Sequence, residues 1–399
     1  MTMTINNEHN KLNVPNLRFP EFQGEWKKCK LSEICTFFSG GTPSSSNKDF
    51  YGGNIAFIRS GELHADSTEL FITQAGFDSS SAKMVEVGDL LLAMYGATSG
   101  DIAVSKIKGA INQAILCIRT KQNKKFIESV WNKHVSKNLR KYLQGGQGNL
   151  SADIVKGISF FFPTSKEQEK IANLVSLLDE RIATQNKIID KLQSLIKGIM
   201  VELQKQGVNK GTWKKVFLSD VLTERNERNT NLFQVFSVSV SQGVVNQVDY
   251  LGRSFAAKDT SKYNVVHYGD LVYTKSPTGS FPYGIVKQSL NLENVAVSPL
   301  YGVYKPKSLA VGAYLHEYFM SEINTHNYLH PLIQKGAKNT INITNQRFLE
   351  NSVLLPINTN ELLLISKMLR SLNDKLKYLQ GILQKYQKQK QYLLRQMFI

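Results

Sequence analysis

Two stretches of this chain carry apolar residues at spacings that alternate between four and three, with Gln185 and Lys390 as polar exceptions. This heptad pattern predicts two long helices, residues 166–206 and 358–399, each about 60 Å long at about 1.5 Å per residue. Such stripes must be covered, and the economical arrangement is an antiparallel coiled coil of the two helices. The alternative is that each helix docks separately on its own domain. The stripes are Ile171, Val175, Leu178, Ile182, Gln185, Ile189, Leu192, Ile196, Ile199, Leu203 and Ile365, Leu369, Leu372, Leu376, Leu379, Leu383, Tyr386, Lys390, Leu393, Met397.

The rest of the chain has short apolar runs separated by loops rich in glycine, serine and threonine. Two helical patterns are expected, at residues 126–143 and 311–324, and the segment 207–212 is expected to break the first long helix because it contains two glycines. This mixture predicts α+β domains with long loops. Buried strands are expected near residues 55–58, 90–94, 115–118, 160–162, 235–238, 271–273 and 300–304.

Landmarks of the first half return in the same order in the second half. Trp26-Lys27-Lys28 is matched by Trp213-Lys214-Lys215, Gly88-Asp89-Leu90 by Gly269-Asp270-Leu271, and Pro163 by Pro356, with a long helix after each proline. We therefore expect an α+β protein with two similar globular domains about a pseudo-two-fold axis, a symmetry that duplex DNA shares. The expected boundaries are a tail and extended arm at 1–25, a first domain at 26–164, a helix and linker at 165–212, a second domain at 213–357 and a final helix at 358–399.

Charge and cysteine content narrow the class of protein. The chain of 399 residues has a formal net charge of +17 and a pI of about 9.5. This surplus of positive charge favours an anionic partner, and nucleic acid is a better candidate than an anionic membrane. The alternative is that the charge only keeps the protein soluble. Three cysteines without CxxC spacing, a polar start and no apolar run of membrane-spanning length predict a soluble, cytoplasmic protein without a membrane partner.

Sequence motifs for catalysis are missing. No G-x-x-x-x-G-K-[ST], strand-linked G-x-G-x-x-G, Asn-Pro-Pro-aromatic or G-x-S-x-G segment occurs. His326 and His330 have helical metal-ligand spacing, but Pro331 follows at once and no glutamate lies between them, so a surface or packing role is favoured over zinc. We therefore predict no catalytic residue, no metal and no cofactor.

Polar loops offer side chains that can contact DNA, because arginine and lysine bind guanine or phosphate and amides bind adenine. For each candidate taken singly, the alternative is an ordinary polar loop residue. Gly88, Asp89, Gly269 and Asp270 are interpreted instead as turn residues of the frame. The candidates are Thr42, Ser44, Ser45, Lys48, Arg59, Ser60, Tyr95, Gln147 and Asn149 in the first domain, and Lys275, Ser276, Thr278, Ser280, Tyr283, Lys335, Lys338, Asn339 and Thr340 in the second.

Several motifs together resemble a known family. They are Leu17-Arg18-Phe19-Pro20-Glu21-Phe22 before Trp26, Gly40-Gly41-Thr42-Pro43, Gly88-Asp89-Leu90-Leu91 and Gly96-Ala97-Thr98-x-Gly100, with a proline and a long helix in both halves. In this doubled arrangement the chain resembles the specificity subunit of type I restriction–modification systems. The second domain departs from the pattern, since it has Thr274-Lys275-Ser276-Pro277-Thr278-Gly279 where the first has Tyr95-Gly96-Ala97-Thr98-Ser99-Gly100.

The resemblance implies two target-recognition domains that each read one half of a split double-stranded DNA target. It also implies that the helices set the gap between the halves and hold two methyltransferase subunits, which two ATP-dependent translocase–nuclease subunits can join. The chain would be the non-catalytic subunit of a DNA adenine methyltransferase and restriction endonuclease complex.

The unlike loops of the two domains predict an asymmetric target, with half-sites about one helical turn, roughly 34 Å, apart. Two other interpretations stay open. One is a coiled-coil assembly scaffold without base readout. The other is a self-contained DNA methyltransferase or nuclease with an unrecognised active site.

Overall fold

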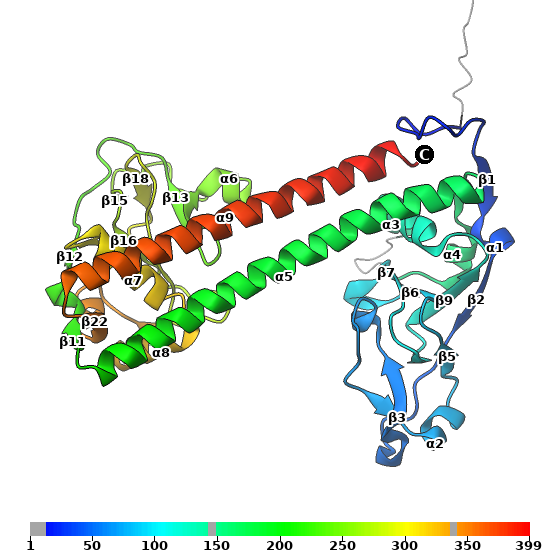
Figure 1. Ribbon diagram of the computed structural model, residues 1–399, viewed down its shortest axis with the longest axis horizontal. Helices are drawn as coiled ribbons and strands as arrows, with labels where there is room; N and C mark the ends of the chain where they lie inside the picture. Colours follow the sequence, from blue (N-terminus) through cyan, green and yellow to red (C-terminus); the bar gives the residue numbers. More distant parts are fainter. Residues whose placement is uncertain (1–12, 143–148, 336–340) are drawn as a thin grey trace, which may run out of the picture. The chain divides into compact units, whose positions relative to one another are not determined.

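A computed structural model of the protein describes residues 13–142, 149–335 and 341–399 (Figure 1). The chain forms two compact units, which are residues 1–185 with 382–399 (unit 1) and residues 186–381 (unit 2). Both units contain parts of two long helices, α5 (Ser165–Asn209) and α9 (Thr359–Gln396). No helix in the described part of the chain is long and apolar enough to cross a membrane.

The two long helices lie side by side within each unit (Figure 1). In unit 1, Lys390 Nζ of α9 lies 2.5 Å from Asp179 Oδ1 of α5. In unit 2, Ile196 of α5 belongs to the same buried cluster as Ile365 and Leu369 of α9. The first half of α5 therefore meets the end of α9, and the second half of α5 meets the beginning of α9, so the helices are antiparallel as predicted.

Every position of the two apolar stripes is buried or half-buried, but the partner helix covers only part of each stripe. In unit 1, Ile171 of α5 and Met397, next to α9, also enter the core of the first domain. In unit 2, Ile196 and Leu362 enter the core of the second domain. The two arrangements considered from the sequence therefore coexist, since the helices pack both on each other and on the domain of each unit.

The first long helix ends later than the sequence pattern predicts. Gly207 lies inside α5, and the chain leaves the helix at Gly211, whose φ is +66°. A Cβ at Gly207 would lie 2.1 Å from Cδ1 of the Trp213 ring. Gly207 therefore allows close packing of an aromatic ring against the helix, and the left-handed turn at Gly211 ends the helix.

The first domain is built on a four-stranded antiparallel sheet of order β2-β9-β6-β7. A second sheet has the order β4-β3-β8-β5, and β1 pairs with β10. The bounds are β1 Lys27–Lys30, β2 Cys35–Ser39, β3 Tyr51–Ile58, β4 Phe71–Ile72, β5 Lys83–Val85, β6 Leu90–Ala93, β7 Ile102–Val104, β8 Gly109–Ile111, β9 Ile115–Thr120, β10 Ser159–Phe162, α1 Leu31–Ile34, α2 Gln74–Asp78, α3 Lys124–Tyr142 and α4 Ala152–Gly157.

Strand β6 lies at the centre of the first domain and is buried on both faces. Leu90 and Leu92 pack with Phe126 of α3 on one face. Leu91 and Ala93 pack with Ile58 and other residues of the second sheet on the opposite face. Because successive side chains of a strand point to opposite faces, a strand covered on both sides needs the uninterrupted apolar run seen in the sequence.

The second domain repeats this frame, with a four-stranded antiparallel sheet of order β12-β19-β16-β17. The order matches β2-β9-β6-β7 strand for strand, which confirms the predicted duplication. The bounds are β11 Trp213–Phe217, β12 Leu222–Glu224, β13 Phe236–Ser239, β14 Gly243–Asn246, β15 Asn264–Val266, β16 Leu271–Tyr273, β17 Val286–Gln288, β18 Val295–Val297, β19 Gly302–Pro306, β20 Gln334–Lys335, β21 Ile341–Asn342, β22 Ser352–Pro356 and α6 Gln247–Leu251.

Residues 311–324, predicted to form one helix, belong to two. α7 spans Leu309–Tyr318 and α8 spans Glu322–Leu329. The side chain of Ser321 accepts a hydrogen bond from the Asn324 amide and caps the start of α8. The prediction of a single helix was wrong because serine, asparagine and threonine side chains can bond to the backbone and start a helix anew.

Each of the two matching tryptophans donates a hydrogen bond to a glutamate in its own unit. Nε1 of Trp26, just before β1, lies 3.3 Å from Oε1 of Glu167, and Nε1 of Trp213, at the start of β11, lies 2.8 Å from Oε1 of Glu361. Both glutamates are in the first turn of a long helix, where the helix dipole also favours a carboxylate. Each tryptophan therefore fixes the start of a long helix to the strand pair that closes its domain.

The two Gly-Asp turns also share their construction. Oδ2 of Asp89 accepts hydrogen bonds from the Glu86 amide at 3.0 Å and from Nη2 of Arg119 at 2.7 Å. Oδ2 of Asp270 accepts hydrogen bonds from the His267 amide at 2.8 Å and from Nε of Arg225 at 2.6 Å. These aspartates build the frame of each domain, as predicted.

Replacing Asp89 with asparagine is expected to destabilise unit 1 by about 1–3 kcal/mol at pH 7, because Arg119 loses a charged acceptor. Burial raises the pKa of the Asp89 carboxyl, but hydrogen bonds from Arg119 and the Glu86 amide outweigh burial, so the net pKa is lowered. A carboxyl with a lowered pKa stabilises the fold above its unfolded pKa of about 4 and loses that contribution as the pH falls through the folded value. Urea unfolding should show a smaller difference between wild type and variant at pH 3 than at pH 7. An equal difference at both values would contradict this account.

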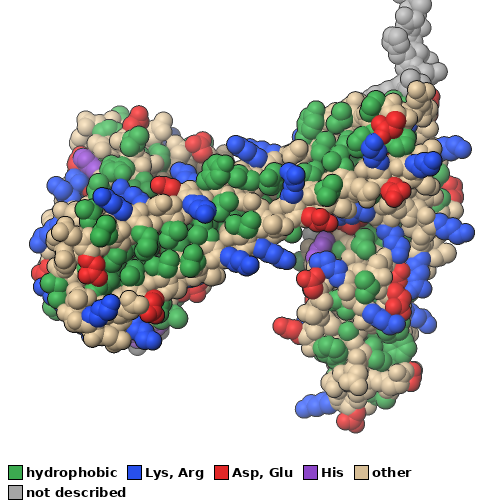
Figure 2. Space-filling model, viewed as in Figure 1, with side chains coloured by type: hydrophobic (Ala, Val, Ile, Leu, Met, Phe, Trp, Pro, Cys, Tyr) green, Lys and Arg blue, Asp and Glu red, His purple; other side chains and the backbone are tan. Residues whose placement is uncertain are grey.

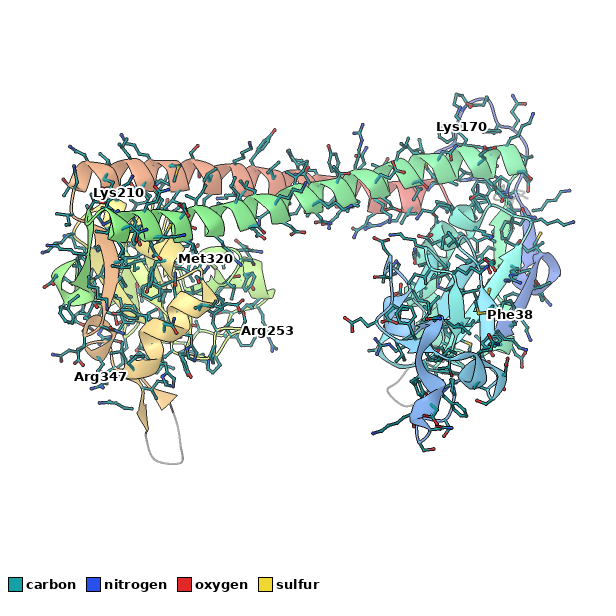
Figure 3. All side chains as sticks on the ribbon, turned by 60° about the horizontal axis from the view of Figure 1, so that its bottom comes forward. Phe38, Lys170, Lys210, Arg253, Met320 and Arg347 are labelled. Atoms are coloured by element: carbon teal, nitrogen blue, oxygen red, sulfur yellow. The ribbon has the colours of Figure 1, made fainter. Side chains whose placement is uncertain are left out.

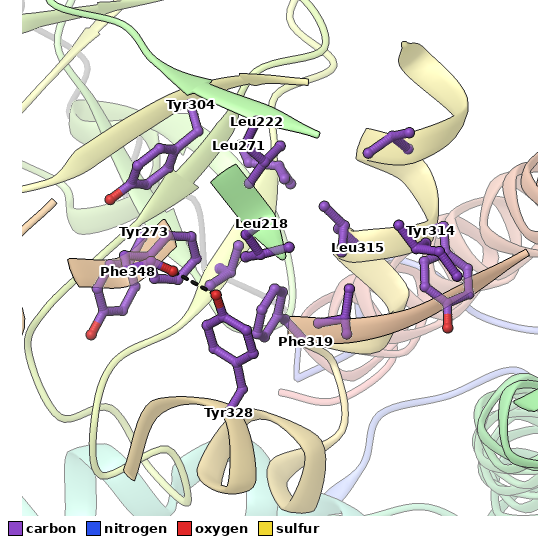
Figure 4. Close-up of a cluster of buried hydrophobic side chains, with 14 of the residues drawn as sticks. Leu218, Leu222, Leu271, Tyr273, Tyr304, Tyr314, Leu315, Phe319, Tyr328 and Phe348 are labelled. Atoms are coloured by element: carbon purple, nitrogen blue, oxygen red, sulfur yellow. Dashed lines mark hydrogen bonds between the residues drawn. The ribbon is translucent and has the colours of Figure 1, made fainter. Parts of the chain in front are cut away.

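The core of the second domain gathers aromatic side chains around Phe348 (Figure 4). The rings of Tyr273 and Tyr304 both stack on the Phe348 ring, with centroids 4.7 Å away. The Tyr328 hydroxyl donates a hydrogen bond to the Phe348 carbonyl at 2.5 Å. The sheet that contains β16 and β19, the helix α8 and the segment before β22 therefore all meet at Phe348.

Candidate nucleic-acid interface

Several loops of the first domain leave the same end of its sheets. Ser39 at the end of β2 pairs with Leu116, and Ala93 at the end of β6 pairs with Ile115, so both strands end where β9 begins. In the second sheet, Ile58 at the end of β3 pairs with Ile111 at the end of β8. The Gly40 amide donates a hydrogen bond to the Asn112 carbonyl and joins the two sheets there. The strand register therefore brings together the start of the 40–46 loop and the loops at 59–64, 94–101 and 112–114.

The 40–46 loop is tightly held at its base and carries exposed hydroxyl groups. A Cβ at Gly40 would lie 1.7 Å from the Ile111 carbonyl oxygen, so no other residue fits this approach. The Thr42 hydroxyl donates a hydrogen bond to Oε1 of Gln113 at 2.6 Å, and the hydroxyls of Ser44 and Ser46 lie 2.7 Å apart. Thr42, Ser44 and Ser45 are all exposed.

Arg59 is at this end of the domain, but it has an intramolecular partner. Its Nη2 lies 2.7 Å from Oε1 of Glu62, and its amide donates a hydrogen bond to the same carboxylate. The side-chain hydrogen bond to Glu62 raises the pKa of Arg59. The neighbouring Ser60 is half-buried. Arg59 can therefore contact a DNA phosphate only if the phosphate replaces the Glu62 carboxylate as its partner.

Lys48 lies away from Arg59, together with the far part of the 40–46 loop, because the Asn47 amide donates a hydrogen bond to the Ser44 carbonyl and the Tyr51 hydroxyl to the Pro43 carbonyl. It lies directly before β3, whereas Arg59 follows the last residue of that strand. An eight-residue strand places the two ends about 25 Å apart at about 3.3 Å per residue. Lys48 is exposed, but it belongs to a different part of the surface.

A contact that the sequence did not suggest joins two of the loops. Nε2 of His64 and Oδ1 of Asp101 lie 2.9 Å apart, and this hydrogen bond raises the pKa of His64. The Leu150 amide donates a hydrogen bond to the Met94 carbonyl, which places the exposed Asn149 beside the loop of Tyr95. The Tyr95 side chain is exposed, and Gln147 lies outside the described residues. No local pattern could have paired residues 64 and 101.

The corresponding loop of the second domain joins β16 to β17. Thr278 and Phe281 exchange two backbone hydrogen bonds at 3.0 Å, which form a tight turn with Ser280 exposed near its tip. Gly284 has a φ of +94°, and a Cβ there would lie 1.7 Å from the Thr274 carbonyl oxygen. Ser280 donates a hydrogen bond to Glu322 at the start of α8. The loop is therefore fixed at its base and near its tip.

Lysines in and near this loop differ in their surroundings. Lys275 is half-buried, and burial lowers the pKa of its ammonium group while attraction to Glu224 opposes this. Ser276 is exposed, Thr278 is half-buried, and Lys335 is in β20. Three further predicted contacts, Lys338, Asn339 and Thr340, lie outside the described residues.

Tyr283 packs against the two histidines that the sequence singled out. Its ring centroid lies 5.3 Å from that of His326 and 6.0 Å from that of His330, and the two imidazole rings stack 5.1 Å apart. The histidines therefore have a packing role at the surface, as expected. Over the described ranges of the chain, no group of three or more His, Cys, Asp or Glu side chains could hold a metal ion.

Two arginines near these loops were not singled out from the sequence (Figure 3). Nε of Arg347 donates a hydrogen bond to the Leu332 carbonyl at 3.1 Å, directly after His330 and Pro331. The guanidinium of Arg253 lies 4.5 Å from the ring centroid of Phe255, whose side chain is exposed. Nη1 of Arg347 also lies 3.7 Å from Oε2 of Glu350, so this guanidinium is paired, whereas Arg253 is exposed.

Hydrophobic side chains gather over α5 and α9 on the face of unit 2 shown in Figure 2. Leu195 and Val201 of α5 are 53% and 64% exposed, and Leu364 and Met368 of α9 are 67% and 38% exposed. An apolar surface of this kind on a helix pair is typical of a contact with another protein.

The chain therefore has two copies of one sheet frame with unlike polar loops, and each copy packs on parts of two long helices. Residues 23–194 match the family model described as the Type I restriction modification DNA specificity domain. The chain is 26% identical over 182 residues to the Type I restriction enzyme MjaIX specificity subunit of Methanocaldococcus jannaschii, covering 42% of each chain. It is 28% identical over 185 residues to the Type I restriction enzyme EcoR124I/EcoR124II specificity subunit of Escherichia coli, covering 44% of this chain and 45% of that one.

In these alignments the chain spans less than half the length of either curated relative. A solved structure, that of the Type-I restriction-modification system S subunit from M. genitalium, has a similar fold, with a TM-score of 0.65 and 12% identity over 97% of this chain and 99% of that chain. Together, the matches confirm the resemblance to type I specificity subunits and the two-domain α+β fold predicted from the sequence.

Proposed function

We propose that this chain is the DNA-binding specificity subunit of a type I restriction–modification complex. Each domain reads one half of an asymmetric, bipartite duplex target, and the long helices set the spacing between the halves. One observation carries the proposal. The sheets β2-β9-β6-β7 and β12-β19-β16-β17 have the same order but present different polar loops at the corresponding end. A shared frame with different loops is what the recognition of two different base sequences requires.

The candidate side chains divide into two groups by their chemistry. Hydroxyl and amide groups such as those of Thr42, Asn149 and Thr278 suit base edges, and lysines such as Lys275 and Lys335 suit phosphates. The net charge of +17 supports a polyanionic partner. We assign methyl transfer to adenine and DNA cleavage to partner subunits, with this chain as the non-catalytic member that needs no cofactor.

The exposed apolar side chains of α5 and α9 are the proposed docking surface for two methyltransferase subunits. Leu195 and Leu364 are both more than half exposed, and a partner that covers them would remove apolar area from water. Two ATP-dependent restriction subunits complete the cleaving form of the complex. A scaffold without base readout would use the same helices, but it would not need lysine-bearing loops on the domains.

The function is tested by mapping methylated bases in cells that contain the methyltransferase partner with and without this chain. A methylated motif with two unlike halves and an unread gap is expected only when the chain is present. Binding of the complex to random duplex DNA should weaken steeply with salt, since phosphate contacts release counterions. Salt-independent binding would favour the scaffold, and methyl transfer by the isolated chain would favour a self-contained enzyme.

Replacing Lys275 with glutamine is expected to weaken binding to all duplex sequences about equally and to reduce the slope of log K against log salt by about 1, as loss of one phosphate contact does. The exposed Lys210, which follows α5, gives a matched Lys210→Gln control that should leave the slope unchanged. Fluorescence anisotropy with specific and random duplexes at several salt concentrations measures both effects. An unchanged slope combined with a new base preference would contradict a phosphate contact at Lys275.

A further inference from the structure

We propose that α8 is the base-reading element of the second domain and that its exposed face enters the major groove of duplex DNA. This inference rests on the function proposed above and names the surface by which one domain reads its half-site. We call this surface the α8 surface and define it by the side chains that line one hollow of about 400 Å³, which are Ser280, Pro282, Glu322, Ile323, His326 and Asn327.

The inner face of α8 is firmly anchored. Thr325, Tyr328 and Leu329 are buried, and the Tyr328 hydroxyl donates a hydrogen bond to the Phe348 carbonyl in the aromatic core. The Asn351 side chain donates a hydrogen bond to the Tyr328 carbonyl at 2.8 Å. A helix held on one face by core contacts presents its other face rigidly, which is the property a base-reading element needs.

The outer face of α8 has no covering element among the described residues. Glu322, Ile323, His326 and Asn327 are exposed, and the Ile323 side chain is 72% exposed. The exposed Ile323 lies next to Glu322 in the sequence and four residues before Asn327, so the three side chains share the exposed side of α8. This side of the helix therefore offers one acceptor group, one donor–acceptor group and one apolar group within about one and a half helical turns.

The loop between β16 and β17 holds the α8 surface in place. The Ser280 hydroxyl donates a hydrogen bond to Oε1 of Glu322. The Tyr283 ring lies beside the imidazole of His326, which in turn stacks on His330. The side chains are therefore pre-ordered by contacts that leave Asn327 and Ile323 pointing outward.

The chemistry of this surface matches base edges in the major groove. A carboxylate accepts a hydrogen bond from cytosine N4, an amide can bond to both N6 and N7 of adenine, and an aliphatic side chain contacts the thymine methyl group. A major groove about 12 Å wide admits an α-helix. Arg347, bonded to the Leu332 carbonyl just after α8, is a cation near the end of this helix, and it can contact a flanking phosphate by exchanging its partner Glu350.

A metal site is the competing use of Glu322, His326 and His330, which are spaced four residues apart. The two imidazole planes are inclined by only 16° and stack face to face. Their nitrogen lone pairs therefore do not converge on one point, as tetrahedral coordination requires. Glu322 is also engaged by Ser280. The arrangement suits a polar contact surface better than a metal ion.

The test uses the full chain in complex with its methyltransferase partner and the variants Asn327→Asp, Glu322→Gln and Ile323→Ala. The matched control is Asn132→Asp, because Asn132 is an exposed helical asparagine on α3 of unit 1. Methylated motifs are mapped for each complex, and binding is measured to the specific duplex, to its single-base variants and to random duplex. Thermal unfolding of each variant establishes that it is folded, and Ile323→Ala at the most exposed position keeps the test available if another variant unfolds.

Each α8 variant is expected to change discrimination at one or two base pairs of a single half-site by roughly ten- to a hundredfold. Binding to random duplex should be unchanged in Ile323→Ala and should shift in Asn327→Asp and Glu322→Gln only as one added or removed negative charge requires. The control should leave the motif unchanged. Unaltered motifs in all three folded variants would overturn the inference, as would an equal loss on specific and random duplex. Stoichiometric zinc in the wild type that is lost in His326→Gln would overturn it as well. If the wild-type complex produces no bipartite motif, the proposed function fails. If the motif is present and is the same in the wild type and in the α8 variants, only this inference fails.

Discussion

Replacing Phe348 with alanine is expected to lower the free energy of unfolding of unit 2 by about 3–5 kcal/mol. The Phe348 side chain is fully buried and its ring is stacked by Tyr273 and Tyr304. The walls of the resulting cavity cannot easily collapse. The Tyr304 hydroxyl is bonded to the Asn345 carbonyl at 3.0 Å and the Tyr273 hydroxyl to the Tyr283 carbonyl at 2.7 Å. Because a cavity that stays open is more destabilising, the loss of unfolding free energy should lie in the upper part of this range.

Hydrogen exchange followed by mass spectrometry measures this effect separately in the two units. Peptides from β16 and β19 should lose protection in Phe348→Ala, while peptides from β6 in unit 1 serve as an internal reference. The matched control is Phe348→Leu, which conserves most of the volume and should cost less than about 1.5 kcal/mol. Unchanged protection of β16 and β19 in the alanine variant would show that the aromatic cluster does not stabilise the domain.

Exchanging residues 26–164 for the corresponding domain of a relative with a different target is expected to replace one half of the methylated motif and to leave the other half unchanged. The two ends of this segment lie on neighbouring strands, since Lys27 of β1 pairs with Phe162 of β10. The second domain is closed in the same way, with Trp213 paired to Pro356. Each domain therefore leaves the helices through a single strand pair, although its core also includes helix residues such as Ile171 in unit 1 and Leu362 in unit 2.

The donor domain must also satisfy the contacts that this segment makes with the long helices, such as those of Trp26 with Glu167 and of Lys125 with Asp179. Phe126 of the first domain packs on Phe398 at a centroid distance of 5.1 Å, so the donor needs an aromatic or large apolar residue there. Each mismatched base pair costs about 1–3 kcal/mol, so loss of two read positions lowers affinity for the original motif by roughly 30-fold or more. Methylated-base mapping checks the result, and the reciprocal exchange of residues 213–357 should change the other half. A change of both halves after one exchange would contradict modular recognition.

Regular elements could be predicted from the sequence where the signal is local. The spacing from Ile171 to Leu203 sets a helical period regardless of what covers the stripe, and α5 and α9 are found where it predicts them. Prediction was wrong where tertiary contacts override local preference. Gly207 looked like the end of a helix but makes room for the Trp213 ring inside it. Ser321 is a different case, since its own side chain caps the start of a new helix, a local effect that the apolar pattern does not reveal.

The candidate interface was harder to predict, because grouping of loops depends on strand order. Arg59 and Tyr95 come to the same end of the first domain only because β3 and β6 end there. Arg59 looked like a free cation, yet Glu62 engages it. Lys48 and Arg59 flank the same strand, yet they lie at its opposite ends, and Lys48 stays beside Ser44. None of these relations follows from the spacing of residues along the chain.

The sequence by itself determined the duplication, the two heptad stripes and the α+β class, because periodicity and repeated landmarks are properties of neighbouring residues and of their order. Only the tertiary structure decided which loops share an edge, which cations are already paired and what covers each stripe. The physical reason is that strand pairing and burial join residues far apart in the chain. Lys27 and Phe162 are one example, and their pairing is fixed by packing of the whole domain.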